Sequence, residues 1–415
     1  MKKLGLFCLA VLLSVFALTL TTSKISGKND KLRKSARAIP NRYIVVLNDD
    51  KDDNSNNFMR AETFEYELNA FHGGKIDKQF TNAIKGYSVE MSAREALSLS
   101  QDARVKYVEE DAEVFASATQ SGATWGLDRI DQRTVPFDGN YNFVSTGAGV
   151  HAYIIDTGIR VTHQDFGGRA VADFDAFNDG QNGNDCNGHG THVAGTVGSS
   201  TYGVAKNVTL HAVRVLNCSA SGSISTIVAG IDYVTRNHVS PAVANISIGA
   251  SGISSTLDSA VANSIASGVT YAIAAGNSNQ NACNYSPARS PNAITVGAST
   301  NMDERVGYSN FGTCVDIFAP GNFIVSTSIA DDTAIASKSG TSMASPHVAG
   351  VAALYLETNP TASPATVASS LTNSATSGIL LNISGTNSPN LLLHSLISTS
   401  TSITPVSERK QRRQR

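Results

Sequence analysis

Three short segments of the chain carry side chains suited to hydrolysing an amide bond. In chain order they are Tyr153–Gly158 (YIIDTG), Asn187–Gly195 (NGHGTHVAG) and Ser339–His347 (SGTSMASPH). The first places Asp156 at the end of an apolar run, directly before a glycine turn. The second places His189 where a glycine-rich loop enters a helix of small residues, and the third places Ser342 at the start of a long predicted helix.

Amide hydrolysis needs a nucleophile, a base that takes its proton, and a group that holds the base in one tautomer. Ser342, His189 and Asp156 are of the right types for these three roles. A serine at a helix N-terminus also gains from the positive end of the helix dipole when negative charge develops beside it. We therefore expect a triad with Ser342 as nucleophile, His189 as base and Asp156 as its partner.

Each segment alone has a simpler explanation. An aspartate after a strand is commonly a cap or turn residue, a serine before a helix is commonly an N-cap, and a glycine-rich histidine loop can bind phosphate or metal. His189 and His192 have no glutamate next to His189, so the zinc-protease motif H-E-x-x-H is absent. The three segments together favour the triad, and we expect His163, His192 and His347 to be structural.

The elements that must position these residues follow from the alternation of patterns after Trp125. Buried strands are predicted at 150–155, 210–215, 244–248, 269–275 and 293–298, and helices at 223–236, 257–266 and 342–357. This alternation is typical of an α/β domain whose mostly parallel sheet carries helices on both faces. Active sites in such sheets lie at the carboxyl ends of the strands.

A smaller unit precedes this domain. Strands are predicted at 42–47, 76–80, 86–91 and 105–108, and helices at 62–71 and 93–101, the second opened by the capping box Ser92–Glu95. The order β-α-β-β-α-β is that of a ferredoxin-like α+β fold, with a folded part of about 40–112. Residues 24–39 and 112–124 are small and polar or basic, and we predict that both are linkers.

The two ends of the chain have biased compositions. Lys2 and Lys3 precede an apolar run to about Leu20, which predicts a secretory signal peptide over 1–23; an uncleaved membrane anchor is the alternative. Residues 401–415 form a basic tail that we expect to be disordered. The 32 basic and 34 acidic residues give a net charge of −2, which excludes a whole-chain basic surface for nucleic acid.

Cysteine usage agrees with export. Cys8 would leave with the signal peptide, and the remaining four are Cys186, Cys218, Cys283 and Cys314. An even number in an exported protein predicts disulfides, and four cysteines allow three sets of pairs. Four buried free thiols are the alternative.

With these segments, residues 125–393 resemble the subtilisin-like serine proteases, and within them the proteinase K group and its secreted, aqualysin-like enzymes. The motifs around Asp156, His189 and Ser342 agree with the family pattern residue by residue. The resemblance implies a catalytic domain over 118–400. It also implies that residues 24–117 are an inhibitory prodomain, which is removed by cleavage between Ser117 and Ala118.

The resemblance also assigns binding residues. Asn277 is implied as the side-chain donor to the oxyanion. An edge segment that pairs with substrate and the walls of the primary specificity pocket are implied at Ala220, Ser221, Gly222, Ser247, Ile248, Gly249, Ala274, Ala275 and Gly276. Because the pocket segments are small and uncharged, we expect cleavage after apolar or aromatic residues. An acid-bearing pocket specific for basic residues is a weaker alternative.

The resemblance also implies disulfides and calcium sites. The family pattern implies the pairs Cys186–Cys218 and Cys283–Cys314. It implies one calcium site at Asp316 with the carbonyls of Pro291 and Ala293, and a second at Asp128, Asp131, Gln132, Asp138 and Asn140, although Asp128 and Asp131 are alternatively helix caps. Oxygen ligands of this kind suit calcium. No organic cofactor is expected.

The predicted function is therefore a secreted serine endopeptidase made as a zymogen. Its expected partners are protein and peptide substrates and its own prodomain, acting as intramolecular chaperone and inhibitor. We expect a monomer that binds no nucleic acid and, after signal removal, no membrane. The competing hypothesis is a catalytically silent binding protein on the same fold.

Overall fold

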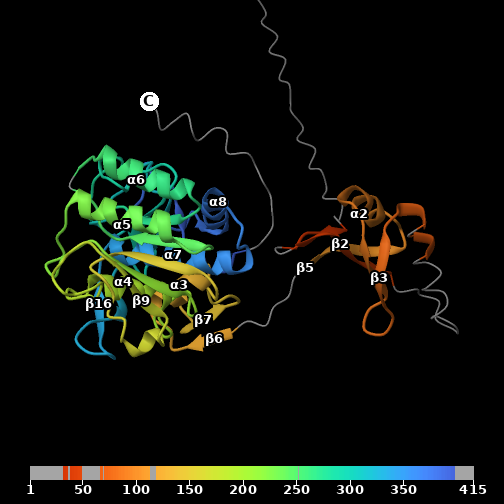
Figure 1. Ribbon diagram of the computed structural model, residues 1–415. Helices are drawn as coiled ribbons and strands as arrows, with labels where there is room; N and C mark the ends of the chain where they lie inside the picture. Colours follow the sequence, from red (N-terminus) through yellow and green to blue (C-terminus); the bar gives the residue numbers. More distant parts are fainter. Residues whose placement is uncertain are drawn as a thin grey trace, which may run out of the picture. The chain divides into compact units, whose positions relative to one another are not determined.

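The computed structural model describes residues 31–35, 38–48, 66–68, 70–112, 118–250 and 252–397. The predicted signal peptide, the basic tail and Ser117 lie outside these residues. The chain separates into two compact units, residues 1–113 and 114–415, which are considered separately below (Figure 1). Among the described residues, no helix combines the length and apolarity needed to cross a membrane.

The first unit is the predicted split β-α-β fold with one additional strand. Its elements are β1 (Leu32–Arg33), β2 (Ala38–Leu47), β3 (Lys75–Phe80), β4 (Gly86–Glu90), α2 (Ala93–Ser100) and β5 (Val105–Ala112). The sheet order is β1-β5-β2-β4-β3, and the pairs β5–β2, β2–β4 and β4–β3 are antiparallel. The predicted capping box is present, since Ser92 N donates to the Glu95 carboxylate and Glu95 N donates to the Ser92 hydroxyl.

The predicted linker at 24–39 and the folded limit near residue 40 are wrong in part. Strand β1 pairs in parallel with β5, and β2 begins at Ala38. Leu32 packs against the core formed by residues such as Val45 and Leu99. A two-residue strand has too short a pattern to be recognised, and its pairing partner lies more than 70 residues away. Of the predicted helix at 62–71, only part lies within the described residues.

The second unit is built on a nine-stranded sheet in the order β17-β18-β14-β13-β12-β11-β8-β10-β9. Its longer strands are β8 (His151–Asp156), β9 (Ala170–Asp175), β10 (Thr209–Arg214), β11 (Ala242–Ile246), β12 (Thr270–Ala274), β13 (Ile294–Ser299) and β14 (Ile317–Pro320), with β9 at one edge. Two short strands, β17 (Thr376–Ser377) and β18 (Leu391–Leu392), close one edge. All neighbours are parallel except β17 and β18.

Helices cover both faces of this sheet, as predicted (Figure 1). One core contains apolar side chains of α4 (His189–Gly198), α7 (Thr341–Thr358) and α8 (Pro364–Ser374). The other contains those of α5 (Ile224–Asn237) and α6 (Ser255–Ala266). Strand β8 serves both cores, because Ile154 faces the first and Ile155 the second. The chain runs from β8 to β9 and β10 on one side and to β11 on the other, so the strand order switches at β8.

Several elements were not predicted. They include β9, β14, α3 (Trp125–Asp131), α8, and the antiparallel pair β15 (Ile324–Thr327) and β16 (Ile335–Lys338). The predicted linker at 112–124 is wrong for 118–121, because β6 (Ala118–Ser121) pairs with β7 (Asn140–Phe143). Polar strand residues such as Thr119 and Gln120 carry no periodic signal, and their pairing is decided by a partner 20 residues later.

Both disulfides that the resemblance implied are formed. Cys186–Cys218 and Cys283–Cys314 have Cα–Cα distances of 4.9 and 5.3 Å. They close sequence separations of 32 and 31 residues. The chain-entropy model gives about 3–4 kcal/mol of stabilisation for loops of this length. The alternative of four free thiols is excluded.

Candidate active site

The carboxylate of Asp156 and the imidazole of His189 meet at the carboxyl end of β8. His189 Nδ1 lies 2.7 Å from Asp156 Oδ1, and Asp156 is fully buried. Asp156 Oδ1 also accepts from Thr157 N at 2.8 Å. The Asp156 carbonyl accepts from Val215 N just beyond β10. The carboxylate is therefore fixed by its own strand and its neighbour, and it selects the His189 tautomer with the proton on Nδ1.

The charge around His189 suits a base. Burial disfavours the imidazolium, but the charge and hydrogen bond of Asp156 outweigh it, and Asp185 adds to the same effect. The cation of Lys338 opposes them. The net result is that the pKa of His189 is raised above its ordinary value. A proton taken from a nucleophile is thus stabilised on this ring.

Ser342 is the second residue of α7, on the same face of the sheet as α4. It is nearly buried, and its hydroxyl donates to the carbonyl of Ser247 at 2.9 Å. In the described part of the chain no hydrogen bond joins Ser342 to His189. Contacts between a nucleophile and its base are often formed only when substrate is bound. In this conformation the Ser342 hydroxyl is therefore bonded to Ser247 and not to His189.

Pro346 explains how α7 is joined to β11. Proline has no N–H, so the carbonyl of Ser342, four residues earlier, loses its intrahelical donor. That carbonyl accepts instead from the hydroxyl of Ser247 at 2.9 Å. The hydroxyl of Ser247 also accepts from Asn245 Nδ2, and Ser345 donates to Asn245 Oδ1. Ser342 is thereby fixed to the carboxyl end of β11 through buried polar groups.

Asn277 follows β12 and is oriented by the residue before the nucleophile. Its Oδ1 accepts from Thr341 N at 2.9 Å and from Thr341 Oγ1 at 3.0 Å. Both bonds occupy the amide oxygen, so the Nδ2 donor group points away from Thr341. Asn277 is exposed, and both its Nδ2 and the backbone N of Ser342 lie beside Gly340, at 3.4 and 3.6 Å from the position of an added Cβ there. Sequence reasoning did not find Thr341, and its position next to Ser342 is the one signal that would have pointed to it.

The structure places the predicted pocket residues on adjacent strand ends. Ser247–Gly249 follow β11, which neighbours β8 in the sheet. Ala274 ends β12, the next strand beyond β11, and Ala275 and Gly276 follow it. Gly276 has φ +101°, and a Cβ there would lie 2.5 Å from Asn310 Nδ2, so a side chain is excluded. Around Gly249 the nearest atom to an added Cβ is Ser286 O at 3.4 Å. The backbone at Gly276 is therefore closely packed against its neighbours, whereas there is room for a small side chain at Gly249.

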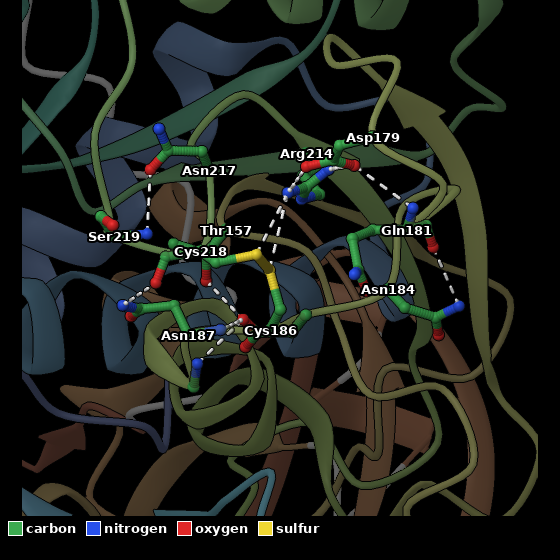
Figure 2. The surroundings of a disulfide bond; sticks show 12 residues. Thr157, Asp179, Gln181, Asn184, Cys186, Asn187, Arg214, Asn217, Cys218 and Ser219 are labelled. Atoms are coloured by element: carbon green, nitrogen blue, oxygen red, sulfur yellow. Dashed lines mark hydrogen bonds and ion pairs between the residues drawn. A yellow bond between two sulfur atoms is a disulfide. The ribbon is translucent and has the colours of Figure 1, made fainter.

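The predicted edge segment is exposed, and hydrogen bonds to Asn217 hold it in place. Ala220, Ser221 and Gly222 are exposed, and Ala220 has φ +54°. Asn217 Oδ1 accepts from Ser219 N and Ser221 N at 2.9 and 3.1 Å (Figure 2). Asn217 N also donates to Ser221 O. The segment is thus held in a fixed turn that leaves one side of its backbone exposed.

The predicted calcium cluster at Asp128–Asn140 contains a carboxylate suited to a cation. Asp131 Oδ2 accepts two bonds from Asn142, whereas the buried Asp131 Oδ1 has no hydrogen-bond partner. Burial raises the pKa of Asp131 to about 6, and the charges of Asp128 and Asp138 act in the same direction. Asp128 accepts from Gly139 N at 2.7 Å. Asp131 is therefore a buried acid short of a positive partner.

The other predicted calcium ligands are already hydrogen-bonded within the protein. Gln132 donates to the carbonyls of Thr134 and Pro136, and Asp138 accepts from Asn140 N. Asp316 accepts from Thr295 N at 2.9 Å, which places it beside the segment that follows Pro291 and Ala293. Among the residues that the structure describes, no three His, Cys, Asp or Glu side chains form a metal-binding group. Any cation here would depend on backbone and amide oxygens as well.

Three further histidines are structural, as predicted. His192 Nε2 lies 2.9 Å from Ile324 O, His347 Nδ1 lies 2.8 Å from Met343 O, and His163 Nε2 lies 2.9 Å from Ala334 O. Burial lowers the pKa of His192 and of His347 to about 4. Both rings therefore stay neutral and act as fixed donors to backbone carbonyls.

Comparison with known proteins identifies similar families and relatives. The subtilase family model (Peptidase S8) matches residues 147–393, and the peptidase inhibitor I9 model matches residues 42–117. An extracellular serine proteinase of Thermus sp. (strain Rt41A) is 50% identical over 409 residues, 95% of this chain and 99% of that protein. Alkaline serine exoprotease A of Vibrio alginolyticus is 46% identical over 374 residues, 86% of this chain and 68% of that protein.

A solved structure agrees with the sequence comparison. The crystal structure of a cold-adapted subtilisin-like serine proteinase is 51% identical to this chain, with a TM-score of 0.65. It aligns over 67% of this chain and all of that one.

Proposed function

The chain belongs to the subtilase family and is a secreted serine endopeptidase made as a zymogen, and we propose that Ser342, His189, Asp156 and Asn277 carry out its reaction. The observation that carries this assignment is the 2.7 Å contact between the buried Asp156 and His189, at the strand edge where α7 presents Ser342. The competing hypothesis of a catalytically silent protein would be favoured by loss of one of these residues, and all four are present.

The reaction follows from what each group can do. His189 Nε2 takes the proton of the Ser342 hydroxyl as Ser342 Oγ attacks the substrate carbonyl, and the resulting imidazolium is stabilised by Asp156. The tetrahedral oxyanion accepts from Asn277 Nδ2 and from the backbone N–H of Ser342. That N–H is the second of α7, so it has no acceptor within the helix. His189 then protonates the leaving amine, and water attacks the acyl-enzyme by the same route.

We propose a preference for apolar or aromatic residues before the cut. The predicted pocket walls, 247–249 and 274–276, carry no charged side chain. A cation buried there without a partner would pay a large desolvation cost. The rival pocket for basic residues would require an acid in these walls.

Peptidyl phosphonates test the assignment and the preference together. A phosphonate with phenylalanine at the primary position should label Ser342 at least about tenfold faster than one with lysine, since an unpaired buried charge costs well over 1.4 kcal/mol. His189→Ala should abolish labelling by both, and His163→Gln is the matched control that should label normally. Peptide mapping by mass spectrometry identifies the labelled serine. Faster labelling by the lysine reagent would favour the basic-specific alternative, and normal labelling of His189→Ala would refute the triad.

Residues 42–117 belong to the peptidase inhibitor I9 family, and the zymogen thus carries its own inhibitor. We infer that maturation cuts between Ser117 and Ala118, directly before strand β6. Pairing of β6 with β7 gives the new N-terminus a defined place in the catalytic unit.

We further propose that calcium stabilises the catalytic unit, since subtilases generally bind structural calcium. Asp131 supports this proposal most directly, because its buried, unpartnered Oδ1 lies near the carboxylates of Asp128 and Asp138. Gln132 and Asn140 would add amide or carbonyl oxygens. Asp316 with the carbonyls of Pro291 and Ala293 would form the other predicted site.

Removing calcium with a chelator should therefore speed the thermal inactivation of the mature protein. A ligand that binds only the native state at a hundred times its Kd stabilises it by about 2.7 kcal/mol. Thermal inactivation half-life should fall in excess EDTA and recover with calcium but not with magnesium. Asp131→Asn should have a shorter half-life in calcium and respond less to EDTA. An unchanged half-life of the wild-type protein in EDTA would contradict the proposal.

A further inference from the structure

A buried carboxylate beside the triad is not used in the mechanism above. Asp185 is 8% exposed and precedes the disulfide residue Cys186. Its Oδ1 accepts from Thr157 Oγ1, Asn187 N and Gly188 N, each at 2.9 Å. Its Oδ2 accepts from Thr191 N at 2.8 Å and Thr191 Oγ1 at 2.7 Å. Five donors on one buried side chain fix it in a single orientation.

Asp185 replaces the missing side-chain cap of α4. The N-cap residue is Gly188, which has φ +96° and faces Ile329 at 3.2 Å from the position of an added Cβ. A side chain at 188 is therefore disfavoured, and the helix cannot be capped in the usual way. Asp185 accepts from Gly188 N and from Thr191 N, the third residue of the helix. His189, the first residue of α4, thus takes its backbone position from Asp185.

The same carboxylate is tied to the strand that carries Asp156. Thr157 Oγ1 donates to Asp185 and accepts from Gly190 N at 2.8 Å, while Thr157 N donates to Asp156 Oδ1. Asp185 is therefore bonded to the residue after Asp156 and to backbone on both sides of His189. The spacing between the base and its carboxylate partner is set by these bonds.

The loop that carries Asp185 is anchored on its other side as well. Asn187 Nδ2 donates to Cys218 O at 3.1 Å, and Cys186 is bonded to Cys218 (Figure 2). His189 N donates to Asn187 Oδ1 at 3.2 Å. Movement of the loop is thereby restricted toward both β8 and the 217–222 segment. Asp185 has little freedom to follow a displaced histidine.

The charged and titratable groups that act on His189 come from three elements. They are Asp156 from β8, Lys338 from β16, and Asp185 and His192 from the loop and helix of His189 itself. Of these, Asp156 and Asp185 are the two that favour the imidazolium. Asp156 is hydrogen-bonded to the ring, whereas Asp185 acts through space.

We infer that Asp185 is a positioning residue of the triad, which holds His189 against Asp156 and supplies a second negative charge for the imidazolium. The inference rests on the proposed role of His189 as the base. Its two parts, geometry and charge, make separable predictions.

Asp185→Asn keeps the shape of the side chain, removes the charge, and places an N–H₂ group against existing donors. The kcat for a short peptide substrate should fall at least about tenfold, because displacement of a catalytic group by about 1 Å can cost up to about 10²-fold. KM should change little, since none of the groups that donate to Asp185 belongs to the predicted edge segment at 220–222. The acidic limb of kcat/KM against pH should move to lower pH, because removing a negative charge lowers the pKa of His189.

Two further variants make the test decisive. Thr157→Val removes one donor but leaves the charge, so kcat should fall while the acidic limb stays in place. Asp165→Asn is the matched control, because Asp165 also accepts from a backbone N–H and a hydroxyl, both of Thr201, but does not act on His189. It should leave the limb unmoved. Each variant is matured by trace wild-type protein and repurified.

An Asp185→Asn protein with wild-type kcat, or with reduced kcat and an unmoved acidic limb, would overturn the inference. If Asp185→Asn yields no folded protein, the inference is tested on Thr157→Val instead. A wild-type kcat in Thr157→Val would then overturn the inference. Failure of the proposed function would look different: the mature Ser342→Ala protein would retain peptidase activity.

Discussion

Replacing Ser342 with alanine is expected to leave the prodomain covalently attached and to abolish peptidase activity. The Ser117–Ala118 bond is proposed to be cut by the chain's own nucleophile, so removing Oγ removes both maturation and turnover. The fall in turnover should be about 10⁶-fold, the size of effect that loss of the nucleophile has in a subtilisin. N-terminal sequencing and intact mass of protein from a protease-free host measure the first effect, and peptide hydrolysis the second.

The control for this experiment is Ser339→Ala, three residues earlier. Ser339 is exposed and accepts from Phe323 N, so its loss should leave maturation intact. Adding a trace of wild-type enzyme should cut Ser342→Ala at the same bond, which shows that the precursor is folded. A mature N-terminus at Ala118 in purified Ser342→Ala, without that addition, would refute self-cleavage.

Replacing Asn277 with alanine is expected to reduce kcat by about 10²–10³-fold, the cost of losing one oxyanion donor in subtilisin. The reason lies in the orientation of its amide: Thr341 N and Oγ1 both donate to Oδ1, so the amide is held in one orientation before any substrate arrives. A donor fixed in advance needs no reorganisation when the oxyanion forms. KM should be nearly unchanged, because the bond strengthens in the transition state and not in the ground state.

Steady-state kinetics on protein matured in trans provide the measurement. Ser278→Ala, at the next exposed position, should behave as wild type. A loss in Asn277→Ala that appears in KM, with kcat reduced less than about threefold, would assign Asn277 to ground-state binding instead. The result would then leave the Ser342 backbone N–H as the main oxyanion donor.

Much of the proposed site could be predicted from the sequence alone. The segments around Asp156, His189 and Ser342 were recognisable because each combines a reactive side chain with a local backbone signal: a strand end, a glycine-rich loop or a helix start. The parallel sheet was predictable because its central strands, such as 151–156 and 242–246, are mainly apolar and are buried on both faces. Most of their predicted bounds lie within one or two residues of the observed ones.

The predicted binding residues could not be assigned from local sequence patterns. Asn277, the pocket walls and the cysteine pairs came from resemblance to a family, since four cysteines alone allow three sets of pairs. The observed pairs agree with that resemblance. The calcium ligands remain a prediction, supported at Asp131 by a buried oxygen without a partner.

Taken by itself, the sequence determined the reactive residues, the alternation of strands and helices and the split fold of the first unit, because these depend on patterns a few residues long. Tertiary structure alone decided the order of strands in the sheet, the pairing of 118–121 with 140–143, and the edge strands β1 and β9. It also decided that Asp185 caps the helix of His189 and that Ser247 replaces the donor Pro346 lacks. A buried polar group must find a partner, but that partner is chosen by which distant segments the folded sheet brings within about 3 Å.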